Sequence, residues 1–341
     1  MTIHLSQKNI SLFVVSFLMF FFCSVSKVFS AKTLPYCIGA DISWVQQQED
    51  KGLTYSDKGV KKDVLNILSD NGFNWVRLRL FVDPKAEKGY SKDGYCDLEH
   101  TLLMAKRIKA SGMKFLLDFH YSDNWADPGK QYVPSSWDSL GGTALEEKIY
   151  SYTKVVLERF RKEGLSPDMV QIGNEINKGM VWPYGKADST LAPLSGLLRS
   201  AGRAVRAVDP KIQTMIHIAC GGQNAESVWF LDQIIKQGVV FDVIGESYYP
   251  EWHGSLEDLK NNLTDLISRY HKQIVVVEYQ VFRKEVNEIV LALPEKKGFG
   301  TFIWEATSPR WGNLFDKDGA TTEYMQLYPD LAEKFKKRLN K

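Results

Sequence analysis

The chain has few cysteines and few histidines for its length. It contains four cysteines and six histidines in 341 residues, and no two cysteines have the Cys-x-x-Cys spacing of a zinc site. A disulfide scaffold is therefore excluded, and the lack of any His-x-His pair disfavours a metal-dependent barrel hydrolase. We interpret Cys37, Cys96 and Cys220 as small apolar packing residues; one disulfide among them is the open alternative.

An excess of charge is also missing. The chain carries 43 basic and 41 acidic residues, and its first thirty residues contain two lysines and no acid. Residues 31–341 therefore carry 41 charges of each sign. Nucleic acids and anionic membranes bind surfaces with a basic excess, so neither is expected as a partner. A neutral substrate is compatible with this balance.

One long apolar run occurs, at the N-terminus. Lys8 precedes the apolar stretch Ile10–Val25, and small or permissive residues lead up to Ser30-Ala31. This pattern predicts a signal peptide over residues 1–30 that is cleaved near Ser30-Ala31. The run is too short for a spanning helix, and Lys27 follows it closely. We expect the mature chain, residues 31–341, to be secreted or periplasmic, monomeric and not inserted in a membrane.

Short β-rich runs alternate with amphipathic helical segments along the mature chain. Eight runs are predicted as strands: 38–44, 73–80, 113–119, 168–173, 212–219, 240–246, 273–278 and 299–304. Helices are predicted over 59–70, 98–110, 144–162, 193–208, 256–270 and 286–293. No linker or repeat interrupts the series, which predicts a single α/β domain, a (β/α)8 TIM barrel. An open doubly wound sheet is disfavoured, because no Gly-rich phosphate turn follows the first strand.

Polar and aromatic side chains gather at the ends of the predicted strands. Active sites of such barrels form at the carboxyl ends of the strands, so these side chains are expected to share one site. The residues concerned are Asp41, Trp44, Arg77, Arg79, Asp118, His120, Trp125, Asn174, Glu175, Glu246, Ser247, Tyr248, Tyr249, Glu278 and Trp304.

Two of these residues are glutamates on strands that lie across the barrel mouth from each other. Cleavage of a glycosidic bond needs one carboxylic acid to protonate the leaving oxygen and one carboxylate that faces the anomeric carbon. We predict Glu175, after the fourth strand, as the proton donor and Glu278, ending the seventh, as the nucleophile. Asn174 is expected to bind a sugar hydroxyl. Solvated loop charges are the alternative interpretation of the two glutamates.

Arg77 and Arg79 are two residues apart and therefore share one face of their strand. A buried arginine must be paired, and ionised Glu278 is the expected partner. This pairing is expected to lower the pKa of Glu278. A salt bridge to Asp41 or Asp118 that only holds the barrel together is the alternative.

Three further residues have expected roles beside the carboxylates. His120 is expected to orient a carboxylate or a substrate hydroxyl, and Tyr248 or Tyr249 to donate a hydrogen bond to the nucleophile. For each of the three, ordinary core packing is the alternative interpretation.

Tryptophans form a second line of evidence. Six of the nine lie at or just after strand ends: Trp44, Trp125, Trp182, Trp252, Trp304 and Trp311. Exposed aromatic rings offer flat apolar platforms for sugar rings. Several at one mouth predict a groove for several sugars and hence internal cleavage of a polymer. Trp75 and Trp229 lie in or beside predicted regular elements, and we interpret them as packing residues.

Five segments resemble a known family. They are GADISW (residues 39–44), VRLR (76–79), DFHYSDNWADP (118–128), GNEIN (173–177) and SYYP (247–250). They are similar to glycoside hydrolase family 53, the endo-β-1,4-galactanases or arabinogalactan endo-β-1,4-galactosidases, which act on pectic galactan. The resemblance runs from about Ile38 to the region around Trp311. It implies Glu175 as acid/base, Glu278 as nucleophile, β-1,4-galactan as substrate and no required cofactor.

Two places depart from the family pattern. Glu278 is followed by Tyr279-Gln280, and Glu246 adds a carboxylate that we expect near the site, where it would perturb the pKa of Glu175 or alter subsite preference. Some family members bind calcium, and Asp316 and Asp318 have the spacing of a calcium turn. An ordinary Asp-Gly turn is the preferred interpretation, with structural calcium as the alternative.

Two other functions remain open at this point. The chain could be a β-mannanase or β-glucanase of the same clan, since galactose differs from glucose only by an axial O4. It could also be a secreted glycan-binding protein with a degenerate barrel, although the presence of both Glu175 and Glu278 argues against that.

Overall fold

The computed structural model describes residues 36–187 and 189–339. The predicted signal peptide, residues 1–30, lies outside the described residues, so its prediction stays untested. Within the described part of the chain, no helix combines the length and the apolar character that crossing a bilayer requires.

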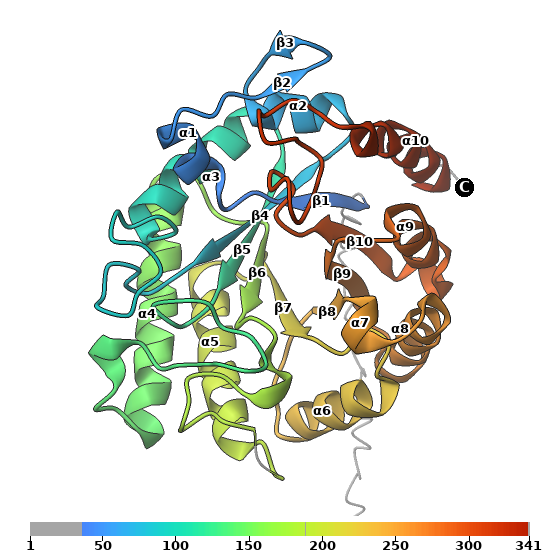
Figure 1. Cartoon of the computed structure of the whole chain (residues 1–341). Helices are drawn as coiled ribbons and strands as arrows, with labels where there is room; N and C mark the ends of the chain where they lie inside the picture. Colours follow the sequence, from blue (N-terminus) through green and yellow to red (C-terminus); the bar gives the residue numbers. More distant parts are fainter. Residues whose placement is uncertain (1–35, 188, 340–341) are drawn as a thin grey trace, which may run out of the picture. The chain divides into compact units, whose positions relative to one another are not determined.

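Eight parallel strands close into a barrel (Figure 1). They are β1 (Cys37–Asp41), β4 (Trp75–Leu80), β5 (Lys114–Phe119), β6 (Met169–Ile172), β7 (Gln213–Ile218), β8 (Val243–Tyr248), β9 (Gln273–Tyr279) and β10 (Gly298–Ile303). Each strand pairs with the next in chain order, and β1 closes the ring by pairing with both β4 and β10. The predicted (β/α)8 barrel is confirmed, with all eight strands at their predicted places.

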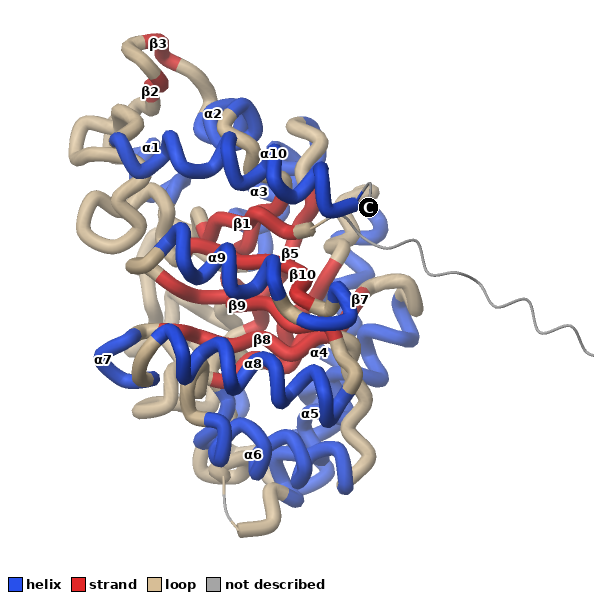
Figure 2. The backbone as a smooth tube through the Cα atoms, turned by 90° about the vertical axis from the view of Figure 1, so that its right-hand side faces the viewer, coloured by secondary structure: helices blue, strands red, loops and turns tan. Residues whose placement is uncertain are grey.

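Helices surround the strands on the outside of the barrel, as Figures 1 and 2 show. They are α1 (Val45–Asp50), α2 (Val64–Asp70), α3 (Leu98–Ala110), α4 (Gly142–Lys162), α5 (Ala192–Val208), α6 (Asn224–Lys236), α7 (Pro250–His253), α8 (Leu256–Tyr270), α9 (Arg283–Ala292) and α10 (Leu327–Leu339). Side chains cap several of them: Asp97 accepts from the His100 N–H at the start of α3, and Ser255 and Asp258 form a capping box on α8. These caps explain why the predicted starts of α3 and α8 are correct.

The helix predicted over residues 59–70 begins too early. Residues 56–61 form a small hairpin of β2 (Ser56–Asp57) and β3 (Val60–Lys61). Lys58 and Gly59 both have positive φ, 50° and 79°, as a tight hairpin turn requires. The helix starts only at Val64, after Asp63, whose side chain accepts from the Leu65 N–H at 2.8 Å.

The floor of the barrel is filled by aromatic rings. Trp75 is fully buried, and its ring centroid lies 5.8 Å from that of Phe299 and 6.3 Å from that of Phe302. Gly39 pairs in register with both Trp75 and Phe302, and a Cβ on it would lie 2.1 Å from a Phe302 ring atom. Trp75 is thus a packing residue, as predicted. Trp229 is not, because its side chain on α6 is 40% exposed.

We predict that Gly39→Ala lowers the free energy of unfolding by about 1–3 kcal/mol, because the new methyl group overpacks the barrel floor. Gly202→Ala on α5 is the matched control, since its methyl group would meet only Val240 O, at 3.6 Å. That variant is expected to stabilise the helix by up to about 1 kcal/mol. Urea denaturation measures both changes. Equal stabilities for the wild type and Gly39→Ala would contradict this packing.

Candidate active site

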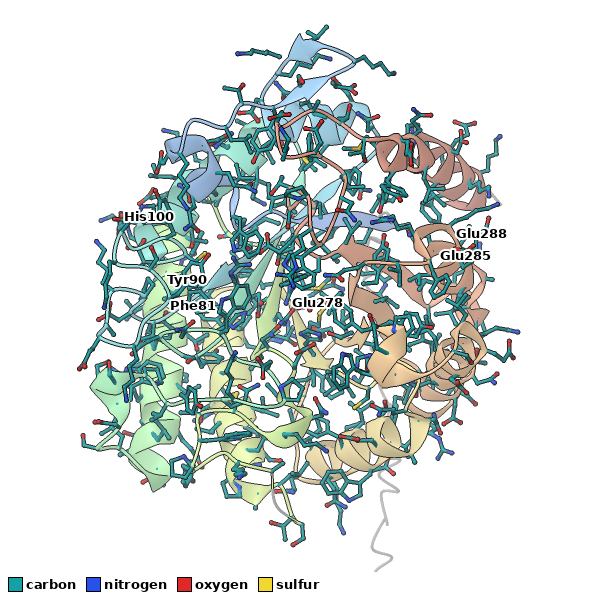
Figure 3. All side chains as sticks on the ribbon, viewed as in Figure 1. Phe81, Tyr90, His100, Glu278, Glu285 and Glu288 are labelled. Atoms are coloured by element: carbon teal, nitrogen blue, oxygen red, sulfur yellow. The ribbon has the colours of Figure 1, made fainter. Side chains whose placement is uncertain are left out.

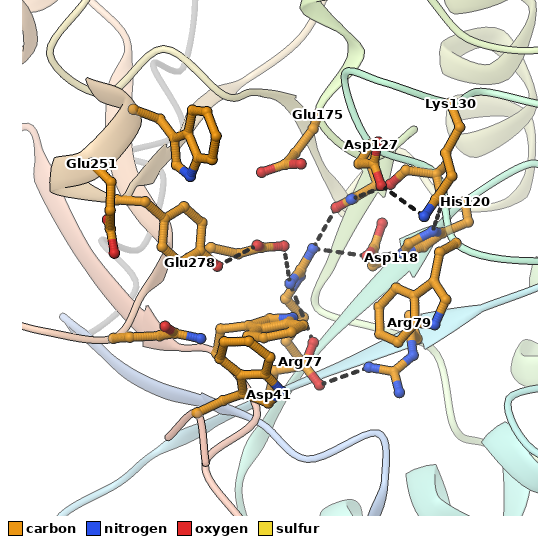
Figure 4. Close-up of a pocket in the computed structure, with 18 residues that line it drawn as sticks. Asp41, Arg77, Arg79, Asp118, His120, Asp127, Lys130, Glu175, Glu251 and Glu278 are labelled. Atoms are coloured by element: carbon orange, nitrogen blue, oxygen red, sulfur yellow. Dashed lines mark hydrogen bonds and ion pairs between the residues drawn. The ribbon is translucent and has the colours of Figure 1, made fainter. Parts of the chain in front are cut away.

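A cleft of about 460 Å³ opens at the carboxyl ends of the barrel strands (Figure 4). Most of the residues predicted for the site line this cleft: Asp41, Arg77, Arg79, Asp118, His120, Trp125, Asn174, Glu175, Tyr249, Glu278 and Trp304. Figure 3 places Glu278 centrally within the ring of strands, whereas Glu285 and Glu288 lie at the periphery on α9. Glu278 is therefore a buried barrel residue and not a solvated loop charge.

Arg77 is the centre of a hydrogen-bond network on the cleft floor. Its guanidinium is 1% exposed, and all five of its N–H groups have an acceptor. Nη1 donates to Glu278 Oε1 (2.8 Å) and Asp41 Oδ2 (3.2 Å), Nη2 donates to Asp118 Oδ2 (2.8 Å) and Asn174 Oδ1 (2.8 Å), and Nε donates to Gln171 Oε1 (3.2 Å). Arg77 therefore has both of the roles considered for it: it pairs with Glu278, and its salt bridges to Asp41 and Asp118 link strands of the barrel.

Glu278 receives a second hydrogen bond, from Tyr249. The Tyr249 hydroxyl donates to Oε2 at 2.9 Å while Arg77 occupies Oε1. Burial raises the pKa of Glu278 by more than Arg77 and Tyr249 lower it. The expected net lowering of this pKa is therefore wrong, because desolvation of the carboxylate outweighs its partners.

Glu175 has a different environment. It follows β6 with a left-handed backbone, φ 49°, and its Oε1 accepts a hydrogen bond from Ser247 Oγ at 2.6 Å. Burial, and then the negative charge of Glu278, raise the pKa of Glu175 to about 8. A carboxyl group with this pKa stays protonated at neutral pH, as a proton donor must.

The two glutamates lie close together across the cleft. One carboxylate oxygen of each lies within 4.8 Å of the other and of a ring nitrogen of His217. No other group of three His, Cys, Asp or Glu residues in the described ranges brings its ligand atoms so close. His217, Glu175 and Glu278 are already engaged with Ser247, Arg77 and Tyr249, so we assign no cation to this group.

Arg79 does not pair with Glu278. Its Nη1 donates to Glu305 and lies 3.8 Å from Asp41 Oδ1, and its guanidinium stacks 4.1 Å from the Trp125 ring centroid. Glu305 was not predicted as a site residue. It follows Trp304 directly after the last strand, and the other carboxylates of the site also lie at strand ends. Arg79 therefore packs against Trp125, one of the aromatic rings that line the cleft, and makes no contact with Glu278.

His120 and Asn174 are held in place by the protein. The Ala126 N–H donates to His120 Nδ1 at 3.2 Å, and Nε2 lies 3.1 Å from Asp118 Oδ2. His120 therefore orients a carboxylate, one of its two expected roles. The Asn174 amide Nδ2 donates to Ala126 O at 2.8 Å, so this side chain is oriented before any sugar binds.

Tyr248 points away from the cleft. Its hydroxyl donates to Gly254 O at 3.0 Å, so of the two tyrosines only Tyr249 reaches the proposed nucleophile. Successive residues of a strand face opposite sides, which places Ser247 and Tyr249 at the mouth and Tyr248 against the helices.

Glu246 also faces away from the cleft, so its predicted influence on the site is wrong. It is fully buried between β8 and helices α6 and α8. It accepts from the Cys220 N–H at 3.1 Å, from Ser227 Oγ at 3.0 Å and from Asn262 Nδ2 at 3.5 Å. Burial raises the pKa of Glu246 to about 8. Its contacts fasten the loop after β7 to two outer helices.

The other departure from the family pattern is Tyr279-Gln280, and only one of these two residues faces the cleft. Tyr279 turns outward, and its hydroxyl lies 3.2 Å from that of Tyr328. Gln280 lines the cleft. Of the two residues after Glu278, only Gln280 can therefore contact a ligand.

The tryptophans form a connected wall around Trp304. Its ring centroid lies 6.3 Å from that of Trp44, 6.2 Å from that of Trp125 and 5.6 Å from that of Trp311. Trp252, also on the cleft, is 76% exposed. Trp44 borders a separate small depression beside the cleft with Tyr90. Trp182 does not line the cleft; its indole N–H donates to Lys178 O at 3.0 Å.

The candidate calcium turn is held by its own hydrogen bonds. Asp316 Oδ1 accepts from the N–H groups of Asp318 and Ala320, each at 2.9 Å. Asp318 is paired with Lys317 at 2.8 Å. This is the arrangement of an Asp-Gly turn. Cys37, Cys96 and Cys220 are buried free thiols.

Two buried polar residues of the site were not predicted, Gln171 and His217, whereas Ser247 was among the polar residues expected at the end of its strand. Gln171 donates to Asp118 Oδ1 at 2.7 Å, and His217 Nε2 lies 2.8 Å from Ser247 Oγ. The available signal was a lone polar residue inside an apolar strand, since Gln171 and His217 interrupt MVQI and QTMIHI.

Comparisons with known proteins show the family and the fold of this chain. The profile of Glycosyl hydrolase family 53 matches residues 37–288. A probable arabinogalactan endo-beta-1,4-galactanase A of Aspergillus terreus is 39% identical over 250 residues, 70% of this chain and 69% of its own length. The GH53 catalytic domain of Ignisphaera aggregans superposes with a TM-score of 0.80 at 34% identity, covering 87% of this chain and 97% of that one. A fungal beta-1,4-galactanase has a TM-score of 0.77 at 29% identity, covering 86% and 98%.

We predict that Arg77→Met lowers the free energy of unfolding by about 3–5 kcal/mol, because it leaves three buried carboxylates without their cation. Arg159→Met is the matched control: Arg159 pairs with Glu99 and Glu163 on the surface, and its loss should cost under about 1 kcal/mol. Thermal and urea denaturation at pH 7 compare the two. Should Arg77→Met not fold, Arg77→Lys provides a milder loss. Similar losses at both positions would contradict the central role of Arg77.

Proposed function

This chain belongs to glycosyl hydrolase family 53 and is a glycoside hydrolase, and we propose that it cleaves β-1,4-galactosidic bonds inside galactan chains with retention of configuration. The observation that carries the proposal is the pair Glu175 and Glu278 at the barrel mouth, with carboxylate oxygens within 4.8 Å. Retaining enzymes hold their carboxyl groups about 5–5.5 Å apart, whereas inverting enzymes leave about 6.5–9.5 Å for a water. The short separation supports the retaining reaction.

Glu278 is the nucleophile in this proposal. Its oxygen attacks the anomeric carbon of a galactosyl unit, and the bond to the departing O4 breaks. Arg77 and Tyr249 hold both oxygens of the carboxylate and stabilise its charge. Since Arg77 is fixed by four other acceptors, the nucleophile is oriented before the substrate binds.

Glu175 is the acid and then the base. Because its pKa is raised, Glu175 is protonated at neutral pH and gives its proton to the departing O4 in the first step. The resulting carboxylate takes a proton from water in the second step, and this water attacks the anomeric carbon and releases Glu278. The first step leaves Glu278 glycosylated and Glu175 ionised, and the second step returns both to their starting states, so one water is consumed for each bond cleaved.

The cleft supports a neutral polymeric substrate. Rings of Trp125, Trp252, Trp304 and Trp311 line it, and they offer apolar faces to successive sugars, which favours internal cleavage. The assignment of galactan comes from the family and its named galactanase relative. Secretion is part of the proposal and is supported by the apolar N-terminal run Ile10–Val25, with cleavage expected near Ser30-Ala31.

We predict that residues 31–341 release reducing ends from debranched β-1,4-galactan and that Glu278→Ala lowers this activity by roughly a thousand-fold or more. Glu246→Gln is the matched control, because this buried glutamate on the neighbouring strand does not line the cleft. That variant should keep its activity. Proton NMR of the first products should show the β-anomer before mutarotation.

Each outcome decides a separate part of the proposal. An α-anomer as first product would overturn the retaining reaction. Activity on mannan or carboxymethylcellulose in place of galactan would overturn the substrate and leave the reaction intact. Tight binding of galactan without turnover would make the barrel a glycan-binding protein.

A further inference from the structure

Glu175 is connected to a buried serine and a buried histidine that no step above uses. Ser247 Oγ donates to Glu175 Oε1 at 2.6 Å, and His217 Nε2 lies 2.8 Å from Ser247 Oγ. Ser247 and His217 are both fully buried, on β8 and β7. Within the described residues, no other hydrogen bond reaches the Glu175 carboxyl group, whereas Glu278 receives two.

The chemistry of these groups fixes which atom donates in each hydrogen bond of the series His217–Ser247–Glu175. Ser247 has one proton, which it donates to Glu175, so its oxygen must accept a proton from His217 Nε2. His217 Nδ1 then accepts, and two donors lie beside it: Gln171 Nε2 at 3.0 Å and the Glu175 N–H at 3.4 Å. Burial and the nearby Arg77 hold the pKa of His217 well below its ordinary value. A neutral imidazole with its single proton on Nε2 donates to Ser247 and accepts at Nδ1 from this pair of donors, of which Gln171 Nε2 is the nearer.

The opposite direction fits less well. With the proton on Nδ1, His217 would donate to Asn174 Oδ1 at 3.0 Å, and the Ser247 proton would turn toward His217. Asn174 Oδ1 already accepts from Arg77 at 2.8 Å and from Gln171 Nε2 at 3.1 Å, so its two lone pairs both have a donor. The distance of 2.6 Å from Ser247 Oγ to the carboxyl oxygen is typical of a hydroxyl that donates to a carboxylate.

We propose that His217 and Ser247 are positioning residues that reserve Oε1 of Glu175 as an acceptor, so that Oε2 carries the catalytic proton to the glycosidic oxygen. The proposal rests on the proposed role of Glu175 as acid and base. Oε2 has no hydrogen-bond partner among the described residues and is not one of the fully buried unpaired atoms. It is therefore the oxygen that the cleft leaves accessible.

The pair also stabilises Glu175 when it is ionised. Glu278 and Asp127 disfavour its negative charge, and Arg77 favours it only from a distance, since all five N–H groups of Arg77 are taken. His217 is neutral, and Tyr249 donates to Glu278. Among the residues that the structure describes, Ser247 is thus the single direct donor to the carboxylate that must act as base in the second step.

Ser247→Ala tests the proposal through the pH profile. Loss of the donor destabilises ionised Glu175, which raises its pKa, so the basic limb of kcat/KM on galactan should move upward by roughly one pH unit. Because the carboxyl group is then no longer held in one orientation and its proton can sit on either oxygen, kcat/KM at the optimum should fall about tenfold. Ser247→Thr keeps the hydroxyl and should restore the wild-type limb. If Ser247→Ala does not fold, Ser247→Cys offers a weaker donor and a smaller shift in the same direction.

A substrate that needs no acid gives a second readout. A β-galactobioside with a 2,4-dinitrophenyl leaving group departs without protonation, so its kcat/KM should fall less than about twofold in Ser247→Ala. A merely structural loss would lower both substrates equally. His217→Phe removes the donor to Ser247 and should shift the limb in the same direction by less.

Ser227→Ala is the matched control. Ser227 is a buried serine that donates to a buried glutamate, Glu246, at 3.0 Å, away from the cleft. It should lower the melting temperature without moving the basic limb. Glu175→Gln separates the two proposals: if it keeps galactan activity, the proposed function fails. If Glu175→Gln is inactive and Ser247→Ala shows an unmoved limb and equal losses on both substrates, only the positioning role is overturned.

Discussion

The site depends on one buried cation, the guanidinium of Arg77. A charge with 1% exposure is stable only when it is paired and hydrogen-bonded, and Arg77 satisfies this with acceptors from β1, β5, β6, β9 and the turn after β6. These contacts join strands that are far apart in the sequence. The same interaction therefore stabilises the barrel mouth and fixes the carboxylate of Glu278, so fold stability and the proposed chemistry have one physical origin.

Two chemically identical side chains receive different roles from their neighbours. Glu278 has a cation and a phenol on its two oxygens, which favour its ionised form against burial. Glu175 has one neutral donor within the described ranges, Ser247, and faces the charge of Glu278, and its pKa rises to about 8. Environments that separate two carboxyl groups in this way assign the acid and the nucleophile. Behind them, Trp75 and Phe302 fill the barrel floor and leave the mouth to polar groups.

The strands could be predicted because each is a short apolar run between helical segments, and the positions of Glu175 and Glu278 followed from the ends of those runs. The direction in which each side chain points was harder to predict from the sequence. Glu246 and Ser247 are adjacent, and which of them faces the cleft depends on a register that shifts at this point of the β8–β9 pairing. The partner of Arg79 is Glu305, which lies beyond the last strand. His217 lies inside a largely apolar strand, so the sequence did not mark it as a site residue. Such contacts are set by tertiary packing, which no local pattern reports.

The most direct test is to trap the glycosyl-enzyme. A 2-deoxy-2-fluoro-β-galactobiosyl fluoride forms the covalent intermediate quickly and hydrolyses it slowly, because the fluorine destabilises both transition states while the good leaving group speeds the first step. Mass spectrometry of peptides from the inactivated enzyme then locates the sugar. The account predicts one fluorosugar on the peptide that contains Glu278 and none in Glu278→Ala. A sugar attached to Glu175 or to any other residue would contradict it.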